Sequence, residues 1–425
     1  MGVAASDAHR AIDAVWRIES PRLIAALARM VRDVGLAEEL AHDALVVALE
    51  QWPESGIPDN PGAWLMATAK HRAIDQLRRR KRLERKHEEL GRDADVTAMQ
   101  TLTESDLAAA IDDEIGDDLL RLVFVACHPV LSMDARVALT LRLLGGLTTE
   151  EIARAFLAPE PTIAQRIVRA KRTLAEAHVP FEAPRGRELV ARLVSVLEVV
   201  YLVFNEGYSA TAGDDWVRPA LCEDALRLGR VLAELAPSEP EVHGLVALME
   251  IQASRLRARV GPSGEPVLLL DQDRGRWDYL LIGRGLAALE RAEVLGGARG
   301  PYALQAAIAA CHARARAAEL TDWGRIAALY TELAEVAPSP VVELNRAVAV
   351  AMARGPEAGL ALVDALTREG SLEGYHLLPS VRGDLLAKLG RLDEARSELE
   401  RAASLTRNAH ERALLLARAA ACRPK

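Results

Sequence analysis

Leu147-Thr148-Thr149-Glu150-Glu151-Ile152 is the stretch that decides the local fold, because it has the pattern of a helix start. The Thr148 hydroxyl can cap the amide of Glu151 while the Glu151 carboxylate reaches back, which forms a capping box. Leu147 can pack on Ile152 as a hydrophobic staple. The sequence therefore predicts a short helix that begins here and runs to about Phe156.

A turn and a second helix follow this start. Segment 157–161, Leu-Ala-Pro-Glu-Pro, cannot stay helical, because the residue before each proline is pushed out of the helical region. The apolar face of the next helix consists of Ile163, Ile167, Ala170 and Leu174. Its opposite face carries Gln165, Arg166, Arg169 and Arg172. Arginine and glutamine suit base edges and phosphates, so the layout is typical of a DNA-binding helix-turn-helix. A structural hairpin with a solvated basic face has the same pattern.

A basic helix is predicted further upstream. Asp59-Asn60-Pro61 supplies an N-cap followed by proline at the first helical position. One face is apolar and consists of Leu65, Met66, Ala69, Ala73, Ile74 and Leu77. The other carries His71, Asp75, Arg78, Arg79 and Arg82. Crowded cations repel each other unless a polyanion compensates them, which favours nucleic acid over a merely solubilising face. Trp64 either packs into the core or stacks on an unpaired base.

Two further helices precede the basic one. Apolar residues recur at helical spacing from Leu23 to Val34, Gly35 is expected to break the helix, and a second helix begins near Ala37. The residues outside the apolar stripe of that second helix are Glu38, Glu39, His42, Asp43, Val46 and Glu50. This face is either solvated or a protein-docking surface, and periodicity does not separate the two.

Composition predicts an all-α protein of several domains. The chain has 425 residues, of which 50% are hydrophobic and only 4% aromatic. The net charge of -8 taken alone argues against a nucleic-acid binder. The charges are segregated, however, with nine lysines and arginines in 70–86 and a run of acidic residues in 104–118. The basic segment 70–86 therefore keeps nucleic-acid binding open despite the negative net charge of the whole chain.

Nothing in the sequence points to an enzyme. We find no Gly-rich phosphate loop, nucleophile elbow, metal-binding His pair or distinctive carboxylate pair, so no catalytic residue, cofactor or metal site is predicted. Cys127, Cys222, Cys311 and Cys422 are expected to be reduced, packed thiols, and Cys127 beside His128 is at most a single metal-ligand pair. The N-terminus lacks a signal-peptide pattern and no apolar run is long enough for a membrane span, so we expect a cytoplasmic protein.

The C-terminal half has the pattern of an internal repeat. Pro180, Pro184 and Gly186 mark a boundary, after which apolar helical runs recur. Gly355 is followed by Ala358 and Ala365 at the spacing at which Gly390 is followed by Ala395 and Ala402. A repeat near 34 residues with small residues at helix crossings is typical of tetratricopeptide repeats, which offer a groove for a protein or peptide. The apolar run 267–270 fits an inter-helix loop better than a strand, and Trp277 is expected to pack between helices.

Two DNA-binding modules in this order resemble sigma factors of the extracytoplasmic-function type, in the sigma-70 family. Segment 37–45 resembles the family's helix that docks on the polymerase β′ clamp helices, and 63–80 resembles the helix that opens and reads the minus-ten element. Segment 147–174 is similar to the helix-turn-helix that reads the minus-thirty-five element. The chain is most similar to a subgroup with a tetratricopeptide-like extension, in which segments such as 204–208 and 271–278 recur without an evident physical role.

The resemblance implies the following sites and boundaries. The minus-ten residues are Asn60, Trp64, Lys70, His71, Arg72, Asp75, Arg78, Arg79 and Arg82. The minus-thirty-five residues are Thr162, Gln165, Arg166, Arg169 and Arg172, and the polymerase-binding residues are Glu39, His42, Asp43, Val46 and Glu50. Partners are promoter DNA and core RNA polymerase, through its β′ clamp helices and β flap. The domains are sigma domain 2 (1–86), an acidic linker (87–116), sigma domain 4 (117–180) and the helical extension (187–425).

Two other classes of protein remain open. An ordinary regulator that joins a helix-turn-helix to repeats leaves segment 37–82 unexplained. A repeat scaffold that binds only proteins predicts no salt-sensitive DNA binding.

Overall fold

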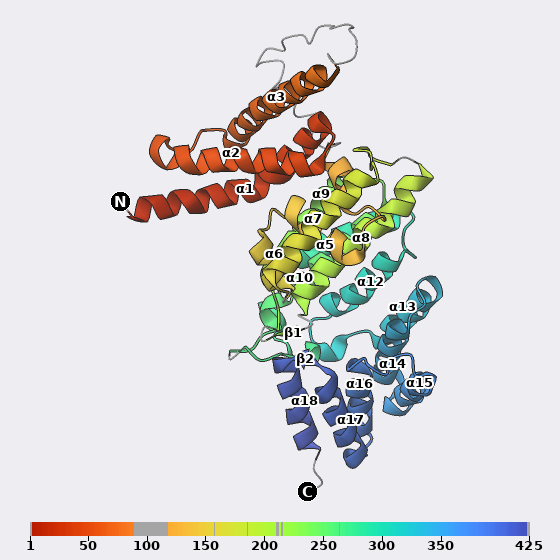
Figure 1. Ribbon diagram of the computed structural model, residues 1–425. Helices are drawn as coiled ribbons and strands as arrows, with labels where there is room; N and C mark the ends of the chain where they lie inside the picture. The colour runs from red at the N-terminus through yellow and green to blue at the C-terminus, as the bar shows by residue number, and fades with distance from the viewer. Residues whose placement is uncertain are drawn as a thin grey trace. The chain divides into compact units, whose positions relative to one another are not determined.

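The computed structural model describes residues 2–88, 118–156, 158–184, 186–209, 212–213, 216–262 and 264–422. The described chain is almost entirely helical and divides into two compact units, 1–199 and 200–425, which confirms the all-α prediction (Figure 1). Most of the predicted acidic linker lies outside the described residues. Among the helices that can be described, none is long and apolar enough to cross a membrane.

The first unit begins with three helices that pack on one another, α1 (Gly2–Val31), α2 (Val34–Ser55) and α3 (Pro61–Glu88) (Figure 1). The break between α1 and α2 falls at Arg32, whose φ is 54°, and Asp33 caps α2 by accepting a hydrogen bond from the Leu36 amide at 3.0 Å. The predicted break at Gly35 is therefore wrong, because Gly35 lies inside α2. An aspartate N-cap, rather than a glycine, sets this helix start.

The start of α3 agrees with the prediction. The Asn60 side-chain oxygen accepts a hydrogen bond from the Ala63 amide at 3.0 Å, and Pro61 is the first helical residue. The helix buries Leu65, Met66, Ala69 and Ala73.

The helix-turn-helix forms as predicted, with a shorter turn. It follows helical residues 118–126 and α5 (Met133–Leu143) and consists of α6 (Thr149–Ala155) and α7 (Glu160–Glu176). Both hydrogen bonds of the capping box are present, from the Thr148 amide to Glu151 at 2.8 Å and from the Glu151 amide to Thr148 at 3.1 Å. The expectation that 157–161 is wholly non-helical is wrong at its end. Pro161 lies in the first turn of α7, where its missing N–H is not needed.

Helix α8 (Arg187–Tyr208) begins in the first unit. Arg192 donates to the carbonyl of Phe124 at 2.8 Å, and Ser195 accepts from Arg136 at 2.6 Å. These bonds attach the first half of α8 to the helix-turn-helix module. The compact unit thus extends to Val199, past the boundary that the prolines suggest.

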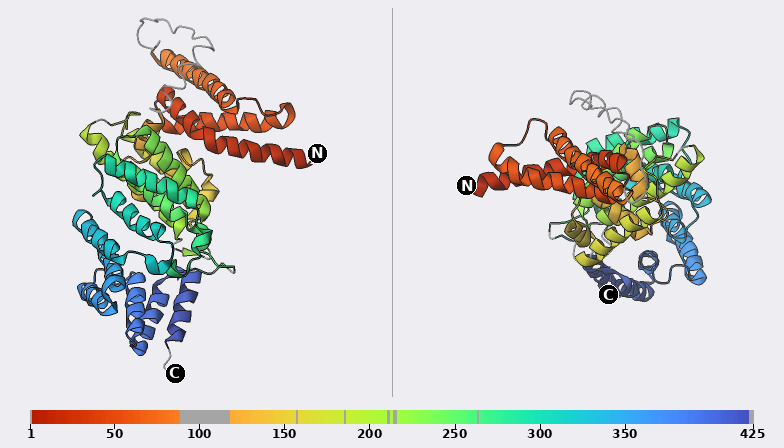
Figure 2. Two further views of the ribbon diagram at one scale, coloured as in Figure 1. Left: turned by 180° about the vertical axis from the view of Figure 1, so that it is seen from behind. Right: turned by 45° about the horizontal axis from the view of Figure 1, so that its top comes forward.

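The second unit is a succession of helices. They are α9 (Pro219–Leu235), α10 (Pro240–Ala253), α11 (Tyr279–Val294), α12 (Pro301–Arg314), α13 (Trp323–Val336), α14 (Pro340–Arg354), α15 (Pro356–Glu369), α16 (Leu377–Lys388), α17 (Leu392–Leu405) and α18 (Ala409–Ala421). From α12 to α18 each helix packs on the next, as the opposite views of Figures 1 and 2 show.

Short elements connect the helices of this unit. They are the 3-10 turns η1 (Leu256–Ala258), η2 (Leu269–Asp271), η3 (Arg274–Arg276) and η4 (Ala318–Leu320) and the strands β1 (Ala212–Gly213) and β2 (Arg407–Asn408), which pair in parallel. The loop prediction for 267–270 is confirmed, and Trp277 is buried with 4% exposed. The two-residue strands were not predicted. Three cysteines are buried and Cys311 is half-buried, all as free thiols.

Two glycines mark equivalent places in successive hairpins. Gly355 joins α14 to α15 and Gly390 joins α16 to α17, with φ of 105° and 74°. Such angles favour glycine. The crossing of α14 and α15 centres on Gly359 rather than Ala358, because a Cβ at Gly359 would lie 2.4 Å from the Cβ of Ala351.

Gly359→Ala and Gly283→Ala form a matched pair of helix substitutions. Gly283 in α11 has open space where a Cβ would lie, so alanine should stabilise the protein by about 0.5–1 kcal/mol through helix propensity. At Gly359 the clash with α14 should outweigh that gain and destabilise by about 1–3 kcal/mol. Urea unfolding followed by helical circular dichroism measures both, and equal shifts of one sign would contradict the tight crossing.

Candidate nucleic-acid interface

One face of α7 packs in the core of the module and the opposite face is exposed to solvent. The buried face is Ile163, Ile167, Ala170 and Leu174, as the spacing predicts. On the opposite side Thr162, Gln165, Arg169 and Arg172 are exposed. Arg166 is half-buried and forms an ion pair with Asp134 of α5 at 3.1 Å. Arg172 lies 3.4 Å from Glu176, one turn further along α7.

Four of the five predicted minus-thirty-five residues share a depression between α5 and α7. The depression has a volume of 420 Å³, and its lining includes Thr162, Gln165, Arg166 and Arg169. It also includes Asp134, whose carboxylate holds the Arg166 guanidinium beside it. The structure thus groups hydrogen-bond donors on a concave part of the helix-turn-helix.

The outer face of α3 carries further cations. His71, Arg72, Asp75 and Arg78 are exposed, and Arg72 forms an ion pair with Asp43 of α2 at 3.0 Å. Lys70 is half-buried, and burial together with the charge of Arg29 lowers its pKa. Arg79 and Arg82 belong to α3, but their side chains lie outside the described part of the structure.

Trp64 packs on a core residue, which is one of its two expected roles, and stacking on an unpaired base stays a prediction. It packs edge-on against the buried Trp52 with ring centroids 5.3 Å apart, yet it remains half-buried near the exposed Asn60.

The predicted polymerase-binding face of α2 is only partly outward. Glu39, Asp43 and Glu50 are exposed, and 50% of Val46 is exposed. His42 turns inward and packs on Trp16. Its Nδ1 lies 3.0 Å from the Glu38 carbonyl and its Nε2 lies 2.8 Å from an Arg142 nitrogen, so Nδ1 donates and Nε2 accepts. Burial and the Arg142 charge lower the pKa of His42, which keeps the ring neutral.

The expectation that Glu38 lies on the outer face is wrong. Only 4% of Glu38 is exposed, and its carboxylate accepts a hydrogen bond from Arg142 of α5 at 2.6 Å and pairs with Lys171 of α7. Burial raises the pKa of Glu38, but Lys171 and Arg142 outweigh this effect and hold it below the usual range. Glu38 therefore connects α2 to α5 and to α7.

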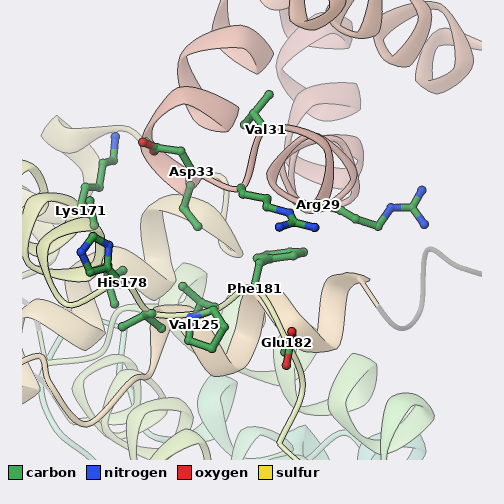
Figure 3. Close-up of a pocket in the computed structure, with 15 residues that line it drawn as sticks. Arg29, Val31, Asp33, Val125, Lys171, His178, Phe181 and Glu182 are labelled. Carbon is green, nitrogen blue, oxygen red and sulfur yellow. The ribbon is translucent and has the colours of Figure 1, made fainter. Parts of the chain in front are cut away.

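A second connection and a cavity accompany this ion cluster. Arg17 of α1 pairs with Glu151, the same carboxylate that closes the capping box. Beside Lys171 lies a cavity of 810 Å³, in which Val31 and Asp33 lie across from Val125 and His178 (Figure 3). Polar and apolar groups both line it.

Family comparisons agree with this architecture. Residues 16–83 match the family model described as Sigma-70 region 2, and 121–174 match Sigma-70, region 4. Residues 192–293 match a family of unknown function, DUF6596.

Individual relatives fall into two groups. An uncharacterized protein of Rhizobium meliloti (strain 1021) is 45% identical over 397 residues, which are 93% of this chain and 92% of that protein. The ECF RNA polymerase sigma factor SigK of Mycobacterium ulcerans (strain Agy99) is 30% identical over 157 residues, 36% of this chain and 78% of that protein. The probable ECF RNA polymerase sigma factor SigI of Mycobacterium tuberculosis (strain ATCC 25618 / H37Rv) is 25% identical over 171 residues, 40% of this chain and 57% of that protein.

The two helical modules and the two matched regions define a sigma factor of the sigma-70 type, a protein of transcription initiation that binds core RNA polymerase and promoter DNA. Because most of the SigK chain is covered at 30% identity, the chain belongs to the ECF RNA polymerase sigma factor family.

Glu38→Gln should destabilise the first unit by about 3 kcal/mol at neutral pH, because the substitution leaves two partly buried cations without their carboxylate. A lowered pKa means that the stabilisation is present above about pH 4.5 and is lost as the pH falls through the folded-state pKa. The difference in unfolding free energy between wild type and variant should therefore shrink below pH 4.5. The exposed Glu39→Gln is the control, with a change within about 0.5 kcal/mol. A pH-independent difference would contradict this account.

Proposed function

We propose that α7 reads the minus-thirty-five element, that α3 opens and reads the minus-ten element, and that the outer face of α2 docks on the β′ clamp helices. The observation that carries the proposal is the shared depression of Thr162, Gln165, Arg166 and Arg169, opposite a fully buried face of α7. The β flap is the second polymerase contact that the family resemblance suggests. An ordinary transcription regulator would use only α7.

Two ion pairs at or near the surface fit this proposal. Arg166 with Asp134 and Arg72 with Asp43 hold cations that DNA phosphates can take over. Exposed pairs contribute only about 0–1 kcal/mol, so exchanging a carboxylate for a phosphate costs little. Asp43 is then freed on the face that we assign to polymerase. DNA binding and polymerase docking would favour each other through this exchange.

We further propose that unit 200–425 is a tetratricopeptide-like extension that regulates the sigma modules through a protein or peptide partner. The successive packing of α12 to α18 and the equivalent glycines Gly355 and Gly390 support the repeat assignment.

Arg169→Ala should reduce promoter-dependent run-off transcription with core polymerase, because an exposed arginine that contacts a base contributes about 1–3 kcal/mol. The template is the region upstream of the protein's own gene. Arg291→Ala, which removes an exposed arginine from α11, is the matched control and should leave the transcript unchanged. Equal output from both variants would remove Arg169 from the site, and no promoter-dependent product from wild type would refute the promoter assignments.

Truncation after Val199 should abolish the run-off transcript if the extension is needed for activity, which is the outcome that we expect. Val199 is a better end point than Pro184, because truncation at Pro184 also removes the bonds of Arg192 and Ser195 to the helix-turn-helix module. Increased output from the chain that ends at Val199 would show instead that the extension inhibits. Loss of output from the Pro184 truncation alone would point to the missing α8 contacts.

A further inference from the structure

Segments 204–208 and 271–278, which have no evident role in sigma function, lie against one buried arginine. The Arg255 guanidinium carbon lies 5.9 Å from the ring centre of Tyr208 and 5.9 Å from that of Trp277. Arg259, one turn along the chain, lies 3.8 Å from the centre of the Tyr208 ring. Arg274 lies 4.6 Å from the centre of Trp277. Arg259 also lies 5.4 Å from the centre of the Trp216 ring, so three arginines cluster around three aromatic rings.

Among the described residues, no carboxylate pairs with Arg255 or Arg259. Arg255 is 7% exposed, and neither its side chain nor that of Arg259 forms an ion pair or a side-chain hydrogen bond within the described chain. Burial is the main cause of the lowered pKa of Arg255, and the other groups that act on it are Tyr208, Arg259 and Tyr330. Removing a guanidinium from water without a counter-charge is costly.

Several half-buried arginines outside the cluster do have such partners. Arg218 pairs with Glu206 at 2.5 Å, and Arg230 pairs with Glu250 at 2.8 Å. Arg382 binds two carboxylates, those of Asp364 and Glu398. The lack of a carboxylate partner at Arg255 and Arg259 is therefore specific to this cluster and is not general in the unit.

Several enclosed polar atoms in this part of the fold have no hydrogen-bond partner. Among the described side chains they are Nε of Arg255 and Arg259, Nε1 of Trp216 and Trp277 and Nδ1 of His312, and Oε1 of Gln272 is an unpartnered acceptor. His312 is buried, and burial with the charges of Arg255 and Arg274 lowers its pKa to about 4, so it adds no charge at neutral pH. Four of the unpartnered atoms are N–H donors and Oε1 of Gln272 is an acceptor, while Nδ1 of the neutral His312 ring is a donor or an acceptor according to its tautomer.

The cluster approaches the surface at Arg259 and Trp277. Arg259 is only partly buried. Trp277 lines a surface depression of 580 Å³ whose lining also includes Arg257, Arg276 and Asp278, but neither Arg255 nor Arg259. Aromatic rings cover guanidinium faces, whereas guanidinium N–H groups point outward in the plane and suit the oxygens of a carboxylate or phosphate.

We propose that Arg255 and Arg259 form the binding site for the carboxylate or phosphate group of a small anionic ligand, with Tyr208 and Trp277 as its aromatic walls. Arg274 positions Trp277, since its guanidinium is bonded to the carbonyls of His312 and Ala315. The proposal concerns the second unit alone and does not depend on promoter recognition.

The test uses the full-length protein with sodium phosphate, sodium succinate or sodium chloride at one ionic strength. Phosphate or succinate should raise the melting temperature in a saturable way, by about 3–6 °C at tenfold excess over Kd, and should slow hydrogen exchange of residues 254–278. A response to phosphate alone assigns a phosphate ligand, and a response to succinate alone assigns a carboxylate.

Variants locate the effect. Arg255→Gln and Arg259→Gln should each weaken the apparent affinity at least tenfold, whereas the exposed Arg291→Gln should keep it. If Arg255→Gln fails to fold, Arg259→Gln at the partly exposed position decides. The proposal is overturned if neither anion protects wild type more than chloride does, or if Arg259→Gln retains the full response.

Discussion

The buried carboxylate of Glu38 is the interaction on which the arrangement of the first unit depends. It joins α2 to α5 through Arg142 and to α7 through Lys171, over separations of more than a hundred residues. Arg142 also fixes His42, so one cation orients two side chains of α2. The remaining residues of that face, Glu39, Asp43, Val46 and Glu50, stay outward. One buried carboxylate and an exposed acidic face thus coexist on α2.

The sequence predicts those features that local chemistry controls. Asn60 and Thr148 begin their helices as expected, and the four apolar residues of α7 are all buried, because caps and periodicity act within a few residues. Local chemistry does not predict the burial of Glu38. Its burial requires cations that come from Arg142 and Lys171, and no local pattern reports a partner so distant. Its position next to the apolar stripe of α2 was the one available signal.

Other differences have similar causes. A proline inside the first turn of α7 is compatible with a helix, so Pro161 does not lengthen the turn. The prolines before α8 suggest a domain boundary, but the bonds of Arg192 and Ser195 extend the compact unit. The cluster around Arg255 combines residues from α8, the segment that follows α10 and 271–278, which only the tertiary fold brings together. The positions assigned to DNA and polymerase rest on family resemblance and on exposure.

The capping box of α6 has a consequence for the order of folding. At seven residues, α6 is too short to persist as an isolated helix in water. Its N-terminus depends on Glu151, which also binds Arg17, a residue synthesised 134 positions earlier. During translation the N-terminal helix therefore emerges first and is available as a docking partner when the helix-turn-helix leaves the ribosome. The helix-turn-helix therefore gains one of its stabilising contacts from α1, a segment that is synthesised well before it.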